Sequence, residues 1–218
     1  MKLALRLVTA SVLAAAPTLS VIVSTPALAC GNSYRYELDP KTNMIVKAEE
    51  ALHEGDYTTA LRFAVDATGA FGKSVEGQSD PKQIAMLRAR GLRVASIATV
   101  RTNGTTSLGA GKAKADPATN VTWAVAQLRV LAQRESSPYL QARLAEGLAK
   151  TAATAPEALQ ILQKLAANDL MPDAAAWQLL AQLEGDAGHA AERDKAIEQC
   201  KTRASDPATC KVKGPGEG

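Results

Sequence analysis

Three cysteines, Cys30, Cys200 and Cys210, are the residues of this 218-residue sequence best suited to covalent chemistry. Cys200 and Cys210 lie close together, and Asp206-Pro207 between them favours a turn. They predict a disulfide, which on loop-closure entropy would contribute about 3 kcal/mol and hold the C-terminal tail against the last helix. The alternative pairs Cys30 with Cys200 or Cys210 and joins the two ends of the chain. No Cys-x-x-Cys motif is present, so a thioredoxin-like redox role is not expected.

Other catalytic and cofactor motifs are weak or missing. His53 and His189 are the only histidines, and neither has a Cys or His at metal-ligand spacing. The run Gly109-Ala110-Gly111-Lys112 matches a phosphate-binding loop only in part, because Thr106 replaces its first glycine and Ala113 its Ser or Thr. No Gly-x-Ser-x-Gly nucleophile motif occurs. The sequence therefore predicts no catalytic residue, no metal and no cofactor, and we expect a protein that is not an enzyme.

The first 29 residues have the parts of a secretory signal peptide. Lys2 and Arg6 give it a basic start, an apolar stretch follows, and Ala27-Leu28-Ala29 places small residues where signal peptidase cleaves. Pro17 within the apolar stretch and the small residues at the cleavage site argue against a membrane helix that is kept in the mature protein. We therefore expect residues 1–29 to be removed and the mature protein to be exported.

Cys30 would be the first residue after cleavage, and two outcomes stay open for it. It resembles the lipid-bearing cysteine of bacterial lipoproteins, although Ala27 and Leu28 stand in the reverse of the usual order. Gly31 rather than Asp follows it, which resembles outer-membrane sorting. Plain cleavage would instead leave an ordinary thiol in the periplasm. A lipid on Cys30 is the only contact with a membrane that we expect.

The composition favours helices and gives no sign of a nucleic-acid surface. Hydrophobic residues make up 46% of the chain but aromatic residues only 4%, and alanine supplies much of the apolar count. Alanine is the best helix former, whereas sheets prefer branched and aromatic residues. Residues 30–218 contain 23 basic and 22 acidic residues, a net charge of +1 against +3 for the whole chain. Such a mixed surface predicts no nucleic-acid partner.

Residues 44–204 have the apolar spacing of three to four that is typical of amphipathic helices. We expect about eight helices and no strand, arranged as antiparallel hairpins over residues 44–68, 81–134, 139–168 and 173–203. A lead-in at residues 30–43 and a C-terminal tail at residues 205–218 flank this helical domain. The predicted fold is therefore all-α, with hairpins stacked in an α-solenoid.

Helix-ending and helix-starting residues mark the connections. Gly55 can take the left-handed conformation that ends a helix, and Asp56 can cap the next one. Asp80-Pro81 starts the third helix, and Asn103-Gly104 ends it. Residues 103–120 form a Gly-, Thr- and Lys-rich loop that is long for a compact domain, so we expect it to be either mobile or functional.

The first hairpin resembles the tetratricopeptide repeat. That repeat has a small residue midway along its first helix, a Gly-Asp-Tyr turn, an Ala-Leu start to its second helix and a further Ala one helical face later. These positions are occupied by Ala48, Gly55-Asp56-Tyr57, Ala60-Leu61 and Ala67. The later hairpins match less well, and the one interrupted by residues 103–120 departs most.

The resemblance implies a concave surface lined by the first helix of each pair, which in the family binds peptides or helices of partner proteins. By analogy, five residues lie on the groove side of the first pair: Thr42, Ile45, Glu49, Leu52 and His53. The alternative is that some of them are ordinary solvated positions. Arg90 and Arg101 fall on one line of the third helix, with Arg93 nearby, either as a patch for an acidic partner or as a solvated face.

These expectations favour a non-catalytic scaffold or adaptor of the bacterial cell envelope that holds a protein partner in the groove. One alternative is an enzyme or small-ligand-binding protein with a site near residues 103–120. Another is a structural exported protein without a specific partner. A deep pocket with convergent polar groups beside the loop would favour the enzyme, whereas an open groove would favour the adaptor.

Overall fold

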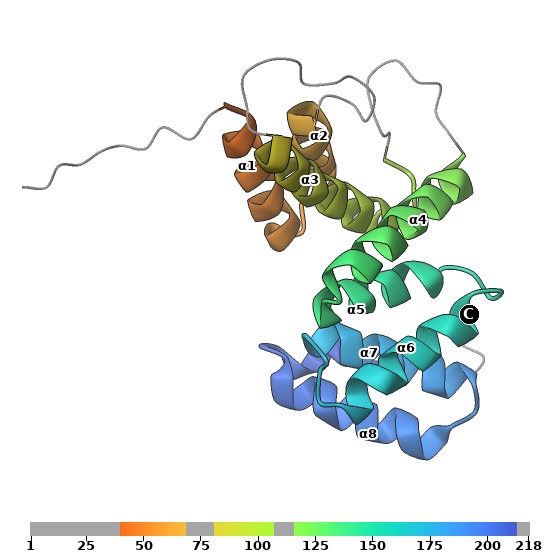
Figure 1. Ribbon diagram of the computed structural model, residues 1–218. Coiled ribbons are helices and arrows are strands. Elements are labelled where there is room, and N and C mark those ends of the chain that lie inside the picture. The colour runs from red at the N-terminus through yellow and green to blue at the C-terminus, as the bar shows by residue number, and fades with distance from the viewer. Residues whose placement is uncertain (1–39, 69–80, 107–115, 213–218) are drawn as a thin grey trace, which may run out of the picture. The chain divides into compact units, whose positions relative to one another are not determined.

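The computed structural model describes residues 40–68, 81–106 and 116–212, and within these ranges the chain is helical without any strand. Contacts divide the chain into residues 1–37 and 38–218, and every described residue belongs to the second unit. The predicted signal peptide, Cys30 and residues 107–115 of the long loop lie outside the described residues. The helices, in chain order, are α1 (Pro40–Glu54), α2 (Tyr57–Thr68), α3 (Pro81–Arg101), α4 (Pro117–Glu135), α5 (Pro138–Leu148), α6 (Ala155–Ala167), α7 (Ala174–Asp186), α8 (Ala190–Arg203) and the short 3-10 helix η1 (Pro207–Thr209) (Figure 1).

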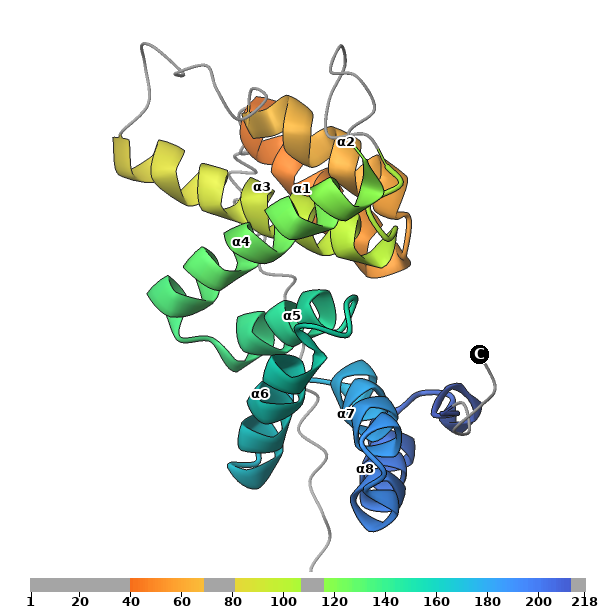
Figure 2. The same cartoon turned by 90° about the vertical axis from the view of Figure 1, so that its right-hand side faces the viewer.

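Each α-helix packs against the next one along the chain, and the odd-numbered helices also contact one another. Thus α1 contacts α3, α3 contacts α5, and α5 contacts α7, whereas the even-numbered helices make no such contacts among themselves in the described part of the chain. Figure 2 shows the succession from α4 through α5 to α6. Helix pairs that stack with one helix of each pair on a shared side form an α-solenoid, so the predicted all-α solenoid of eight helices is confirmed. No described helix has the length and apolar character needed to cross a bilayer.

The turn between α1 and α2 has the conformation predicted from Gly55-Asp56. Gly55 has a φ of 84°, and its backbone N–H donates to the carbonyl of Leu52 at 3.3 Å. The N–H of Asp56 donates to the carbonyl of Ala51 at 2.9 Å, which completes a Schellman motif. The Asp56 carboxylate then accepts the backbone N–H of Thr59 at 3.0 Å and caps α2. Both predicted roles are confirmed.

The Asp56 cap predicts a pH-dependent contribution to stability. Hydrogen bonds from the Thr59 side chain and backbone lower the pKa of Asp56 in the folded chain. A carboxylate with a lowered folded pKa stabilises the fold above its unfolded pKa, and this contribution is lost as the pH falls through the folded value. Asparagine caps a helix without titrating, so Asp56→Asn should lose less stability than the wild type between about pH 6 and pH 2.5. Urea midpoints at the two pH values check this, and an equal loss in both proteins contradicts it.

The two ends of the long loop are held together. Asn103 and Gly104 have φ values of 50° and 72°, and the Gly104 N–H donates to the carbonyl of Thr99 at 2.8 Å. These left-handed residues end α3, as predicted. The buried side-chain amide of Asn120 on α4 donates to the carbonyl of Gly104 at 2.8 Å. Residues 103–106 are therefore attached to the start of α4.

Three helix boundaries differ from the prediction. Helix α1 begins at Pro40 rather than Met44, inside the predicted lead-in. The other two differences have local reasons. Helix α4 begins at Pro117 rather than Val121, because the carboxylate of Asp116 accepts the backbone N–H of Thr119 at 3.2 Å and caps an earlier turn. Helix α5 ends at Leu148 rather than near residue 153. The hydroxyl of Thr154 donates to the carbonyl of Leu148, so the chain closes into a turn there.

Small residues let the helices approach closely, as the sequence predicted. Ala48, Ala60 and Ala64 have no exposed surface at the contact of α1 and α2. Gly91 of α3 lies so near α2 that a Cβ atom there would be 2.3 Å from Cγ2 of Thr68. The buried apolar residues form two clusters, one over α1, α2 and α3 and one from α3 through α8, and the partly buried Leu52 and Trp123 pack against both. Close packing of this kind makes the stack sensitive to added volume.

The predicted disulfide between Cys200 and Cys210 is present. It joins α8 to the residue after η1 with a Cα–Cα distance of 5.8 Å, and both cysteines are buried. The alternative pairing of either cysteine with Cys30 is therefore not made. The side-chain amide of Gln178 on α7 donates to the carbonyls of Thr209 at 2.9 Å and Lys211 at 3.2 Å. Residues 204–212, here called the C-terminal segment, are thus fixed to both α8 and α7.

Candidate functional site

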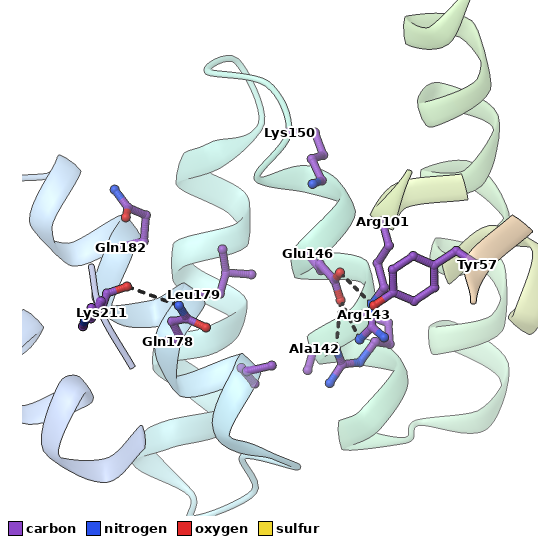
Figure 3. A pocket seen from close by; sticks show the side chains of 12 residues that line it. Tyr57, Arg101, Ala142, Arg143, Glu146, Lys150, Gln178, Leu179, Gln182 and Lys211 are labelled. Atoms are coloured by element: carbon purple, nitrogen blue, oxygen red, sulfur yellow. Dashed lines mark hydrogen bonds and ion pairs between the residues drawn. The ribbon is translucent and has the colours of Figure 1, made fainter. Parts of the chain in front are cut away.

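The odd-numbered helices carry two neighbouring hollows that together form the candidate site. The first has a volume of about 420 Å³, and we call it the α5–α7 pocket (Figure 3). Its lining residues are Tyr57, Arg101, Ala142, Arg143, Glu146, Lys150, Ala175, Ala176, Gln178, Leu179, Gln182 and Lys211. The second has a volume of about 410 Å³, and we call it the α1–α5 hollow. Its lining residues are Glu49, Leu52, His53, Arg93, Val94, Arg101, Tyr139, Arg143 and Asp173.

Arg101 and Arg143 line both hollows, and a shared carboxylate fixes them. Nε of Arg101 lies 3.0 Å from one oxygen of Glu146, and Nη1 of Arg143 lies 2.8 Å from the other (Figure 3). Arg143 also pairs with Asp173, which caps α7 by accepting the backbone N–H of Ala176 at 2.9 Å. The Arg143 side chain is only 3% exposed. This chain of ion pairs connects α3, α5 and the start of α7 through the floor of the site.

Tyrosine rings lie against the same two guanidinium groups. The centre of the Tyr57 ring is 5.5 Å from the guanidinium carbon of Arg101, and that of Tyr139 is 5.0 Å from the guanidinium carbon of Arg143. Both distances suit cation–π attraction. Burial is the largest single effect and lowers the pKa of Arg101, but the charge and hydrogen bond of Glu146, together with Tyr57 and Tyr139, outweigh it, so the net change raises that pKa. Arg101 therefore keeps its charge even though it is partly buried.

The three arginines predicted as either an acidic-partner patch or a solvated face are paired within the chain. Arg90 makes two hydrogen bonds to Glu49, one of them 2.9 Å long, and this pairing raises the pKa of Arg90. Arg93 lies 3.1 Å from Glu135, and Arg101 binds Glu146 as described above. These three ion pairs connect α3 to α1, to the end of α4 and to α5. The charges of the three arginines are thus largely neutralised within the chain.

Two lysines at the α5–α7 pocket differ from these arginines. Lys150 follows the end of α5, and Lys211 belongs to the C-terminal segment. Both are exposed, and no carboxylate of the described residues lies within ion-pair distance of either one. Figure 3 shows them on different sides of the pocket. The pocket therefore carries two ammonium groups that form no ion pair with the residues the structure describes.

The five groove residues predicted from the sequence have different environments. Glu49, Leu52 and His53 line the α1–α5 hollow, whereas Thr42 is half-buried and lines neither hollow. Ile45 is 1% exposed and belongs to the core, where its Cδ1 lies close to Gly91. A partner has no access to Ile45. Ile45 is therefore not part of the proposed binding surface.

Sequence reasoning missed most of the α5–α7 pocket. Arg143, Glu146 and Lys150 recur at three- and four-residue spacing, so they share one face of α5 and its extension. Gln178 and Gln182 show the same spacing on α7. The polar spacing on each helix could therefore have been detected in the sequence. Nothing in the sequence, however, indicates that the polar face of α5 and that of α7 line the same pocket.

A third hollow, of about 440 Å³, lies beside the described ends of the long loop. Asn103 and Pro117 line it together with α4, α5 and the turn that follows α5. Lys150 is the only ionisable residue among its described lining residues. General acid–base catalysis needs a positioned pair of titratable groups, which these residues do not supply. No catalytic role is assigned to this hollow.

No group of three or more His, Cys, Asp or Glu side chains suited to a metal ion occurs in the part of the chain that the structure describes. His53 lines the α1–α5 hollow, and Nδ1 of His189 lies 2.7 Å from a carboxylate oxygen of Glu184.

Comparison with family models, with curated proteins and with solved structures finds no match for this chain.

Proposed function

We propose that this chain is a non-catalytic scaffold of the bacterial cell envelope that binds a protein partner on the surface formed by its odd-numbered helices. The observation that carries this proposal is that the α1–α5 hollow and the α5–α7 pocket adjoin each other and share Arg101 and Arg143 as lining residues. The surface extends over α1, α3, α5 and α7, so an extended peptide or a helix can contact several helices at once. Stacked helix pairs use their shared side for binding in this way.

The site is arranged before any partner binds. Arg101 and Arg143 are held by Glu146 and Asp173 and by two tyrosine rings, so little side-chain entropy is lost when a partner contacts them. Two ammonium groups and several small side chains complete the surface. Such a mixture of polar and apolar groups is typical of protein interfaces that form and dissociate.

Two features support an extracytoplasmic location. The N-terminal 29 residues have the pattern of a secretory signal, and the Cys200–Cys210 disulfide is a bond that persists in oxidising compartments. The mature protein would then work in the periplasm, or at the outer membrane if Cys30 carries a lipid. Mass spectrometry of the mature N-terminus distinguishes a lipid-modified Cys30 from a free one.

Site-specific crosslinking in cells tests the scaffold proposal. A photoreactive benzoylphenylalanine replaces His53 or Gln182 on the odd-helix surface, and Gln160 or Lys164 on α6 as exposed controls. We expect a discrete crosslinked protein from His53 and Gln182 and none from the α6 positions. Ile45 is unsuitable for this test, because a substitution there disrupts the core. The same products from α6, or none from either side, would remove the support for a partner-binding surface.

A further inference from the structure

Deepening the proposed scaffold function, on which this inference rests, we infer that the α5–α7 pocket binds an acidic peptide segment of the partner. The charge of the pocket carries the inference. Among its described lining residues are four cations and a single carboxylate, that of Glu146. Arg101 and Arg143 are neutralised by Glu146 together with Asp173 from the adjoining hollow. The ammonium groups of Lys150 and Lys211 supply the remaining positive charge.

The floor between these lysines suits a peptide chain. Ala175 and Ala176 of α7 and Ala142 of α5 leave room for a backbone, and Leu179 gives an apolar contact. The amide nitrogen of Gln178 donates to the C-terminal segment, and that of Gln182 donates to Asp186 at 3.0 Å. The amide oxygen of each is thus available to accept a peptide N–H. An acidic peptide places its carboxylates near the lysines and its N–H groups near these oxygens.

The disulfide has a direct role at this site. Lys211 follows Cys210, whose bond to Cys200 fixes the C-terminal segment to α8, while Gln178 fixes it to α7. Besides the disulfide, the solvent-exposed hydrogen bonds of Gln178 and the packing of Val212 against the core hold Lys211 at the pocket. The disulfide therefore helps to position one of the two anchoring charges. Its contribution is present only in a compartment that forms disulfides.

Fluorescence anisotropy of the intact mature chain tests the inference. The probe is a fluorescein-labelled peptide of alternating glutamate and alanine, and the controls are the same peptide with glutamine for glutamate and an oligothymidylate of equal charge. We expect binding of the glutamate peptide that weakens with added salt, and at least about tenfold weaker binding of the other two. Equal binding of the oligonucleotide would identify a general anion site and overturn the inference, and so would equal binding of the glutamine peptide.

Charge-reversal variants locate the binding. We expect the double variant Lys150→Glu/Lys211→Glu to bind the glutamate peptide about tenfold or more weakly than the wild type, because it places like charges at both anchors. The matched double variant Lys164→Glu/Lys195→Glu changes the same net charge on α6 and α8, outside the pocket, and should alter the affinity by less than about twofold. Equal losses of affinity in the two double variants would mean that the peptide responds only to the net charge of the protein. The α5–α7 pocket would then not be its binding site.

The role of the disulfide is tested by a double-mutant comparison. Cys200→Ala/Cys210→Ala should weaken peptide binding by the same factor as Lys211→Ala, and combining the two changes should weaken it no further. Circular dichroism verifies that each variant is helical. Independent, multiplying effects would show that the disulfide does not act through Lys211. If the peptide fails to bind while crosslinking from His53 in cells still captures a partner, the acidic-peptide inference fails and the scaffold function survives.

Discussion

Gly104→Ala is expected to lower the free energy of unfolding by about 3 kcal/mol, the largest effect of any conservative change considered. Gly104 has a φ of 72°, where an alanine side chain costs roughly 1–2 kcal/mol. A Cβ atom there would also lie 2.1 Å from the carbonyl oxygen of Pro117, which is backbone and cannot rotate away. Relieving this clash separates α3 from α4 and breaks the hydrogen bond from Asn120 to Gly104. Urea unfolding followed by circular dichroism measures the loss.

Gly188→Ala is the matched control for this prediction. Gly188 has a φ of 81°, but no heavy atom lies within 4 Å of the place where its Cβ would be. An alanine there has the unfavourable positive φ but no steric clash, so we expect the free energy of unfolding to fall by only about 1 kcal/mol. The difference between the two variants isolates the contact with Pro117. Equal losses would contradict the close approach of Gly104 to the start of α4.

Arg143→Ala is expected to destabilise the fold by about 2 kcal/mol. The side chain is 3% exposed and binds Glu146 and Asp173, so its removal leaves Asp173 without its arginine partner and Glu146 paired with Arg101 alone. The stacking on Tyr139 is lost as well. The estimate is below that for a fully buried pair because Asp173 remains 39% exposed and water screens its charge. Chemical denaturation compared with the wild type measures the effect.

Arg129→Ala provides the comparison that separates burial from ion pairing. Arg129 also makes two hydrogen bonds to one carboxylate, that of Glu157, but their side chains are 42% and 41% exposed. An exposed pair of this kind contributes little, so we expect a loss of no more than about 0.5 kcal/mol. If Arg129→Ala costs as much as Arg143→Ala, then the position of Arg143 beneath the two hollows has no special importance for stability.

The helices and their turns were predictable because the information that specifies them is local. The three-to-four spacing of apolar residues, the left-handed Gly55 and the capping Asp56 act within a few residues of one another. Cys200 and Cys210 are ten residues apart, so their pairing needs only a turn between them. The boundary at Pro117 was misplaced because Asp116 was not recognised as a cap.

The candidate site was predictable only in part, because burial depends on neighbouring helices. Ile45 lies at a helical position suited to a groove, yet Gly91 of α3 allows that helix to approach so closely that Ile45 is covered. Glu49, Leu52 and His53 lie beside it on the same helix and line a hollow. No periodicity in the sequence distinguishes these positions.

By itself, the sequence determined that residues 44–204 are mainly helical and where most of the turns fall, and it favoured the pairing of Cys200 with Cys210. Only the tertiary structure decided which charges meet. Arg101 and Glu146 are 45 residues apart, and Arg143 and Asp173 are 30 residues apart. The physical reason is that local patterns fix the conformation of each helix, but packing fixes its rotation and its distance from the next one. The rotation and spacing of the helices determine whether Arg143 is buried beside Glu146 and Asp173. They also determine whether Lys150 and Lys211 line the same pocket.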